Sequence, residues 1–277
     1  MTFMDFEFSV RKRTFRLHIP RMLVIFFAIL VLGLWLFNTP DGLLGKADAI
    51  GYAICHRIDM RSFHLGDRTL PLCSRCSGTY LGVILSLLYF TTFKRKASFF
   101  PPRKILLILG LFILIYAVDG LNSYFSLISN SLRIYEPNNI FRITTGMLFG
   151  ISLTSVVYPS FNQSLWHETD NIPPLQTIKQ LGILVFLGII LVLLVVSENV
   201  FILYLVALIT SLGVLILLTM IYTMILLILT RREGLATSWK ELMLPAIGGF
   251  SLAILQIGLI DLARYLLMGT WEGFNFL

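Results

Sequence analysis

Seven stretches of the chain are each long and apolar enough to form a helix that crosses a membrane. A bilayer core roughly 30 Å thick needs about 20 apolar residues in helical conformation. Hydrophobic residues make up 57% of the sequence and charged residues 13%, which a water-soluble surface cannot accommodate. The sequence therefore predicts an all-α, polytopic transmembrane helix bundle that forms one membrane domain over residues 1–277. The predicted spans are residues 21–37, 78–93, 104–125, 140–158, 180–196, 200–229 and 242–268.

The distribution of lysine and arginine predicts which side of the membrane each loop occupies. Basic loops resist translocation and stay in the cytoplasm. With the N-terminus inside, fourteen of the 22 basic residues fall in cytoplasmic segments and eight fall outside. We therefore expect an N-in, C-out, multi-pass protein of the cell membrane of a bacterium or archaeon, in which residues 38–77 form an extracytoplasmic loop. The net charge of +7 then reflects topology and attraction to anionic membrane lipids, so no nucleic-acid partner is expected.

Two glycine pairs predict where helices touch. Gly78 and Gly82 are four apart in one predicted span, and Gly146 and Gly150 are four apart in another. Small residues at this spacing let two helix backbones approach closely in a membrane. The pairs therefore indicate packing sites, without indicating a function.

All three cysteines of the chain fall within the predicted extracytoplasmic loop. Cys73 and Cys76 have the spacing that lets two thiolates reach one zinc ion, and Cys55 with a histidine would complete a tetrahedral set. His56 is next to Cys55 in sequence, and adjacent residues rarely bind one metal comfortably. His64 is therefore the alternative fourth ligand, and water or a substrate is another. We predict a zinc site in this loop.

A disulfide or thiol relay is the main alternative use of these cysteines. The predicted loop faces the side of the membrane where oxidising conditions favour disulfides. A bond between Cys73 and Cys76 would leave Cys55 as a resolving thiol, and the protein would then be a membrane thiol-disulfide oxidoreductase that passes electrons to a quinone. Three cysteines cannot all pair within one chain, however, and a metal accounts for the odd number more simply.

The cysteine segment also carries a motif that continues into the next predicted span. Its residues are Cys55-His56, Arg61-Ser62-Phe63, Pro71-Leu72-Cys73-Ser74-Arg75-Cys76-Ser77-Gly78, Tyr80 and Gly82, followed by Asp119, Asn122, Arg142, Thr145 and Gly146. This motif resembles the signature of a family of predicted bacterial and archaeal membrane proteins classed as a domain of unknown function. The resemblance covers residues 51–151 and implies a multi-helix membrane protein with a Cys/His motif, but it implies no reaction. Residues 180–277 resemble nothing recognised.

Polar residues inside three predicted spans lie at the same depth as the cysteine loop. Ionisable residues within a membrane are costly and usually mark a functional site or a buried pair. One interpretation is structural, with Asp119 paired to Arg142 and Asp261 paired to Arg264. The other is an outward-facing polar pocket beneath the cysteine loop that binds a lipid-linked or small anionic ligand, with Asp119 and Arg142 as candidate catalytic residues. The predicted pocket residues are Arg57, Arg75, Asp119, Asn122, Asn138, Arg142, Thr145, Asp261 and Arg264.

Several classes of function lack their sequence signatures. The chain has no phosphate-binding glycine-rich loop or dinucleotide fingerprint, so no nucleotide cofactor is expected. The charge-poor inner halves of the predicted spans argue against a continuous polar path for a transporter. A transporter and an auxiliary subunit of a membrane complex stay open as alternatives, and whether the protein is an enzyme is not decided by these patterns.

Overall fold

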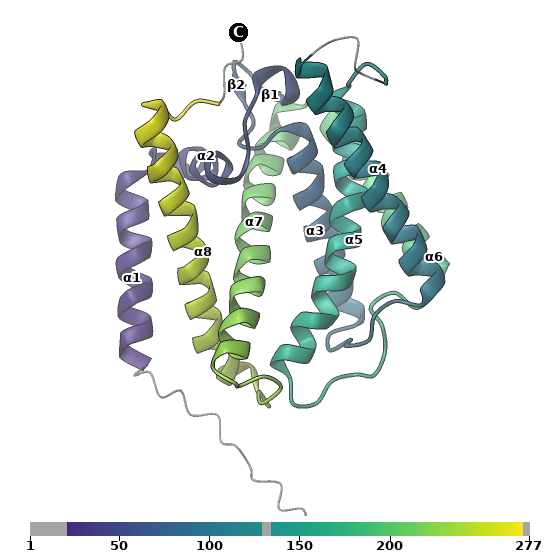
Figure 1. The fold of residues 1–277 in the computed structure, drawn as a ribbon, viewed down its shortest axis with the longest axis vertical. Helices are drawn as coiled ribbons and strands as arrows, with labels where there is room; N and C mark the ends of the chain where they lie inside the picture. Colours follow the sequence, from purple (N-terminus) through teal and green to yellow (C-terminus); the bar gives the residue numbers. More distant parts are fainter. Residues whose placement is uncertain (1–20, 129–133, 274–277) are drawn as a thin grey trace, which may run out of the picture.

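The computed structural model describes residues 21–128 and 134–273, which fold into a bundle of long helices (Figure 1). The described residues form eight α-helices, one 3₁₀ helix and one antiparallel two-stranded hairpin. In chain order these are α1 (Arg21–Asn38), α2 (Gly42–Ile54), η1 (Asp59–Arg61), β1 (His64–Leu65), β2 (Arg68–Thr69), α3 (Ser74–Phe93), α4 (Arg103–Ile128), α5 (Asn139–Leu165), α6 (Ile178–Val196), α7 (Val200–Leu229) and α8 (Trp239–Met268).

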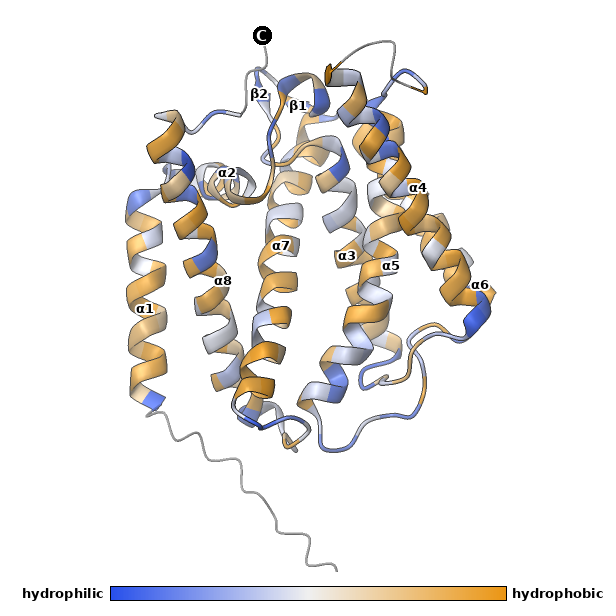
Figure 2. Cartoon of the chain, in the orientation of Figure 1, coloured by the Kyte–Doolittle hydropathy of each residue, from blue (hydrophilic) through white to orange (hydrophobic). Residues whose placement is uncertain are grey.

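Seven of the described helices, α1 and α3 to α8, are long and apolar enough to cross a membrane, which confirms the predicted number of spans. Hydrophobic residues cover these helices along their length, and hydrophilic residues gather near their ends and in the connecting loops (Figure 2). The observed ends lie within a few residues of the predicted ones, except at the end of α5. Their apolar outer faces fit a bundle surrounded by lipid.

Helix α5 continues past Pro159 to Leu165, although the sequence predicted its end at residue 158. Proline inside a helix removes one backbone hydrogen bond and often ends or bends the helix. Here the turn after the proline is held by the loop that follows α3, because the side-chain amide of Asn162 donates a hydrogen bond to the carbonyl oxygen of Ala97 at 2.8 Å. A tertiary contact thus extends the helix beyond its sequence signal.

Helix α2 lies within the predicted loop 38–77 and was not anticipated from the sequence. It is seen nearly end-on among the long helices in Figure 1, so it runs across the bundle axis. With 13 residues it is too short to span the bilayer. Its Ala49 and Tyr52 are fully buried, and Gly51 lies so close to the carbonyl oxygen of Pro71 that a Cβ there would overlap it. The segment is therefore packed into the bundle end rather than forming an open loop.

Helices α3 and α5 pack backbone to backbone through the two glycine pairs. A Cβ on Gly78 would overlap the carbonyl oxygen of Ile143, and one on Gly146 would overlap that of Arg75. Gly82 and Gly150 face the opposite backbone in the same way. The predicted helix contact is confirmed, and it brings the first turns of α3 and α5 side by side at one end of the bundle.

The ends of the bundle differ in how they are closed. Helix α1 begins at the lower end in Figure 1 and α8 ends at the upper end, with α2, η1 and the β1–β2 hairpin also at the upper end. At the lower end the connecting loops join through bridges between Ala97 and Asp170 and between Trp166 and Ala236. That the upper end faces outward stays a prediction. The basic residues at 11–16, on which it partly depends, lie outside the described residues.

Candidate metal centre and the adjacent arginine cluster

The three cysteines come together at the upper end of the bundle. Cys55 follows the last residue of α2, Cys73 is the N-cap residue of α3, and Cys76 lies in the first turn of that helix. Their sulfur atoms all lie within 4.8 Å of one another. The backbone N–H of Cys73 donates to the sulfur of Cys55 at 3.3 Å, which joins the two segments directly. The packing of α2 against the segment before α3 therefore creates one cluster of thiols.

Backbone N–H groups are directed at two of the sulfurs. The Cys55 sulfur accepts from the N–H of Arg57, whose left-handed φ of 52° turns the chain there, and the Cys73 sulfur accepts from the N–H of Cys76. Hydrogen bonds from the thiols of Cys55 and Cys76 hold the pKa of Cys73 well below its usual value, and the bond from Cys55 to Cys73 raises the pKa of Cys55 to about 12. N–H donors and a helix N-terminus stabilise a thiolate, the form of cysteine that binds metals.

Neither predicted histidine ligand belongs to this group of sulfurs. The imidazole of His56, which follows Cys55 directly, does not join the grouped sulfurs, although His56 and Cys73 interact electrostatically. The Nδ1 atom of His56 accepts a hydrogen bond from the N–H of Ile58 at 3.3 Å. His64 lies on the exposed hairpin, and its Nε2 is 3.0 Å from a carboxylate oxygen of Asp59. Among the described residues, the grouped metal-ligand atoms are three thiols without an imidazole.

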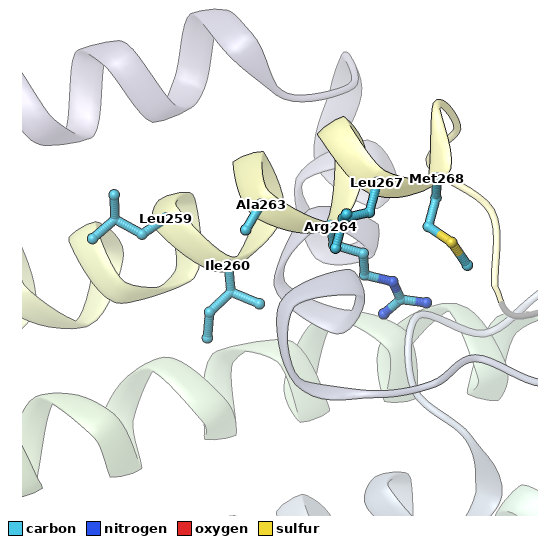
Figure 3. Close-up of a pocket in the computed structure, with 6 residues that line it drawn as sticks. All are labelled: Leu259, Ile260, Ala263, Arg264, Leu267 and Met268. Atoms are coloured by element: carbon cyan, nitrogen blue, oxygen red, sulfur yellow. The ribbon is translucent and has the colours of Figure 1, made fainter.

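Arg264 of α8 fixes the backbone that leads into the cysteine cluster. Its Nη1 donates to the carbonyl oxygens of Tyr52 at 2.5 Å and Cys55 at 2.7 Å, and its guanidinium lies over the Tyr52 ring. Figure 3 shows Arg264 at the edge of an apolar groove of about 450 Å³ on α8. Asp261, one turn earlier, accepts a hydrogen bond from the indole of Trp35 at 3.2 Å. These two predicted pocket residues thus connect α8 to α1 and to the cysteine segment.

Asp119 forms a buried ion pair with Arg75, not the expected pair with Arg142. The Nε atom of Arg75 lies 2.9 Å from Oδ2 of Asp119, and Nη2 contacts the same oxygen. Tyr135 donates its hydroxyl to Oδ1 of Asp119 at 2.5 Å, and Thr145 lies 3.4 Å from Oδ2. Hydrogen bonding to Asp119 and burial raise the pKa of Tyr135 to about 12, with burial the larger effect. Asp119 is therefore engaged on both oxygens.

Two residues at this site were missed as pocket candidates in the sequence, Arg61 and Ser123. The Nη2 atom of Arg61 donates to the backbone oxygen of Ser123 at 2.5 Å, Nη2 of Arg75 donates to its Oγ at 2.8 Å, and Nε of Arg142 approaches that Oγ at 3.4 Å. We call Arg61, Arg75 and Arg142 the arginine cluster. Arg61 occurs in the motif quoted above, but it lies in η1, where helical spacing gives no signal.

The arginine cluster adjoins the cysteines through the start of α3. Arg75 lies between Cys73 and Cys76 in that first turn, and the hydroxyl of Ser74 donates to the backbone oxygen of Arg61 at 3.0 Å. The two groups are therefore built on the same backbone segment.

The side chains of the other predicted pocket residues bind backbone groups or a carboxylate outside the arginine cluster. Arg57 is paired with Asp48 at 2.9 Å, on the side of α2. Asn122 accepts from the N–H of Ile134 at 2.7 Å, and Asn138 caps α5 by accepting from the N–H of Ile140 at 2.7 Å. The structure therefore distributes the predicted pocket over several places, with Arg75, Asp119, Arg142 and Thr145 in one of them.

Comparison with known proteins places this site in a family context. Residues 55–156 match the model of a family described as "Predicted membrane protein (DUF2085)". An uncharacterised protein of Methanothermobacter thermautotrophicus is 34% identical over 100 residues, which are 36% of this chain and 80% of the relative. The chain belongs to this family of predicted membrane proteins. An uncharacterised protein of Methanocaldococcus jannaschii is 28% identical over 120 residues, 43% of this chain and 71% of the relative. No solved structure matches the chain.

The family match agrees with the fold. Together with the seven apolar helices, it identifies a multi-pass protein of the cell membrane with archaeal relatives. The matched segment contains all three cysteines and the arginine cluster, whereas α6, α7 and α8 lie beyond it.

Labelling of single new cysteines will test which end of the bundle faces outward. Met60 is 72% exposed in η1 at the cysteine end, and Ser238 is exposed at the opposite end, where its side chain makes no cap hydrogen bond. We expect a membrane-impermeant maleimide to label Met60→Cys in intact cells and Ser238→Cys only in inverted vesicles, above the signal of the wild-type chain. The reverse pattern would place the cysteine cluster in the cytoplasm.

Proposed function

We propose that the protein is a membrane metalloprotein in which Cys55, Cys73 and Cys76 bind one zinc ion at the outer face of the bundle. The convergence of the three sulfurs within 4.8 Å carries this proposal. Zinc bound by thiolates at about 2.3 Å in a tetrahedron requires sulfurs about 3.8 Å apart, so small side-chain movements bring these atoms to bonding positions. The N–H groups directed at Cys55 and Cys73 are the donors that a thiolate site needs.

Three protein ligands would leave a fourth position of the metal for water or for a ligand. Such an open position is typical of zinc sites that bind or transform a substrate. The neighbouring arginine cluster favours an anionic ligand, either a lipid-linked one or a small one, because guanidinium groups match carboxylate and phosphate oxygens. Asp119 holds Arg75 in place with both oxygens engaged, so we assign it a positioning role.

Thiol oxidoreduction is the second candidate, because Cys73 lies at the N-terminus of α3 with a lowered pKa. Such a thiolate is a good nucleophile. In this reaction Cys73 and Cys76 would form a disulfide and release two electrons and two protons to an acceptor such as a membrane quinone. Cys55 could exchange with this disulfide as a thiolate, forming a new disulfide with one of the two sulfurs and releasing the other as a thiol, with no further change of oxidation state.

Elemental analysis and thiol counting of the same purified samples separate the two candidates. We expect about one zinc per chain and three thiols that react with a maleimide only after chelation. If the protein contains no metal and one reactive thiol under non-reducing conditions, the metal proposal is wrong and the redox candidate is favoured. Three thiols that react freely in a metal-free protein, and still react after treatment with a quinone oxidant, would contradict both.

A further inference from the structure

We propose that Arg61, Arg75 and Arg142 form a binding site for a phosphate group at the outer end of the bundle. This inference rests on the anionic ligand of the proposed function and names its chemical class. It adds Arg61, which lies apart from α3 and α5 in sequence and completes the cluster. The chemistry is shared by inorganic phosphate and by the headgroup of an anionic phospholipid.

The geometry gathers three guanidinium groups around one residue. All three approach Ser123 of α4, one at its backbone oxygen and two at its hydroxyl, at distances between 2.5 and 3.4 Å. They come from η1, α3 and α5. The close contacts of Gly78 and Gly146 with the opposite backbones fix the position of α3 relative to α5. Like charges brought together in this way repel one another unless an anion lies between them.

The positive charge of the cluster exceeds its visible counter-charge. Arg61 and Arg142 are each 6% exposed. In the described part of the chain, Asp119 is the carboxylate that forms an ion pair with the cluster. Burial and the neighbouring Arg75 lower the pKa of Arg61, which reports the cost of keeping it charged there. A zinc ion with three thiolates would add one negative charge, and one positive charge would still be left over. A bound phosphate supplies the missing negative charge.

Arg61 also has a donor available for a ligand. Its Nε atom is buried and has no hydrogen-bond partner among the described residues. A buried N–H of a charged group without a partner is costly, and tetrahedral oxyanions satisfy several guanidinium donors at once. Phosphate fits three converging guanidinium groups better than a carboxylate, since a carboxylate has only two oxygens to share.

Phosphate binding by detergent-purified wild type tests this site. Equilibrium dialysis with radiolabelled inorganic phosphate, at constant ionic strength, should give saturable binding. Arg61→Gln should weaken binding at least about tenfold, as expected for the loss of a charge-assisted bidentate donor. Arg68→Gln is the matched control, because Arg68 lies at the same end and its side chain is 41% exposed against Asp48. Equal losses in both variants would mean general surface attraction and would overturn the proposal.

A second arm distinguishes the source of the phosphate group. Wild type reconstituted with phosphatidylcholine alone is compared with protein reconstituted with added phosphatidic acid, and the lipid retained after purification is identified by mass spectrometry. Retention of phosphatidic acid that depends on Arg61, without binding of inorganic phosphate, identifies a lipid headgroup site. Binding of neither probe by folded wild type would overturn the inference.

Two further measurements keep the outcome interpretable. Arg61→Lys retains the charge but loses the planar fork, and it replaces Arg61→Gln if that variant does not fold. Weaker phosphate binding by Arg61→Lys supports the site, and phosphate binding by this variant as tight as that of wild type contradicts it. Zinc is measured in every sample, so wild-type protein that holds a full equivalent of zinc but binds neither phosphate probe refutes this inference alone. Phosphate binding without any zinc refutes only the metal centre.

Discussion

Replacement of Cys73 by serine should remove zinc from the purified protein almost completely. Cys73 is central to the cluster: its sulfur accepts hydrogen bonds from both other thiols, and its N–H donates to Cys55. Structural zinc sites bind with about 10–16 kcal/mol, so the loss of one of three thiolates costs about 4 kcal/mol, or about a thousandfold in affinity. Cys55→Ser should behave alike. Zinc per chain, measured by elemental analysis on folded, monodisperse protein, checks this result.

Substitution of His56 and His64 distinguishes the three-cysteine site seen in the structure from the site of three cysteines and one histidine that the sequence predicted. His64 is exposed beside Asp59, and the ring of His56 accepts a backbone N–H. We therefore expect His64→Ala and His56→Ala to retain a full equivalent of zinc. If either variant loses zinc as fully as Cys73→Ser does, the site is of the Cys₃His type. A full equivalent of zinc in Cys73→Ser would refute the three-cysteine centre.

Alanine at Gly146 should destabilise the bundle strongly. The added Cβ would overlap the carbonyl oxygen of Arg75, so α3 and α5 would have to separate. Overpacking in a well-packed core costs about 1–3 kcal/mol, and the cost is at the upper end or beyond where backbone atoms must move. We expect a lower midpoint of thermal unfolding, less folded protein after purification and weaker zinc binding, because the first turn of α3 carries both sites.

Alanine at Gly182 is the matched control for this effect. A Cβ at Gly182 of α6 meets nothing within 4 Å, so the substitution adds a methyl group on an open face. Alanine is favoured over glycine in a helix by about 0.5–1 kcal/mol, and this variant should be unchanged or slightly stabilised. An unfolding midpoint of Gly146→Ala equal to that of Gly182→Ala would show that α3 and α5 do not pack as described.

The patterns that predicted well are local in sequence. The seven spans follow from the length of each apolar run, because a bilayer requires backbone hydrogen bonds to be satisfied within each helix. The glycine pairs could be recognised because two residues four apart share one face of a helix. The cysteine cluster was expected because three cysteines lie in one short segment of an otherwise thiol-free chain.

Helix spacing failed where the site depends on how helices pack against each other. Asp119 and Arg75 are 44 residues apart, and their pairing is set by the positions of α3 and α4 across the bundle. In the same packing, the guanidinium of Arg142 donates hydrogen bonds to the side chains of Asn139 and Ser123 instead of pairing with Asp119. Spacing within one helix shows which residues share a face, but it contains no information on which face of another helix lies opposite.

The sequence by itself determined the membrane class, the number of spans, the contact of the two glycine pairs and the segment that gathers the thiols. Only the tertiary structure decided that α2 lies across the bundle end, that both imidazoles lie outside the group of sulfurs, and that Arg61 joins Arg75 and Arg142. The reason is physical. Hydropathy and spacing act along one helix, whereas the partners of buried charges and the directions of loop side chains are fixed by contacts between segments distant in the chain.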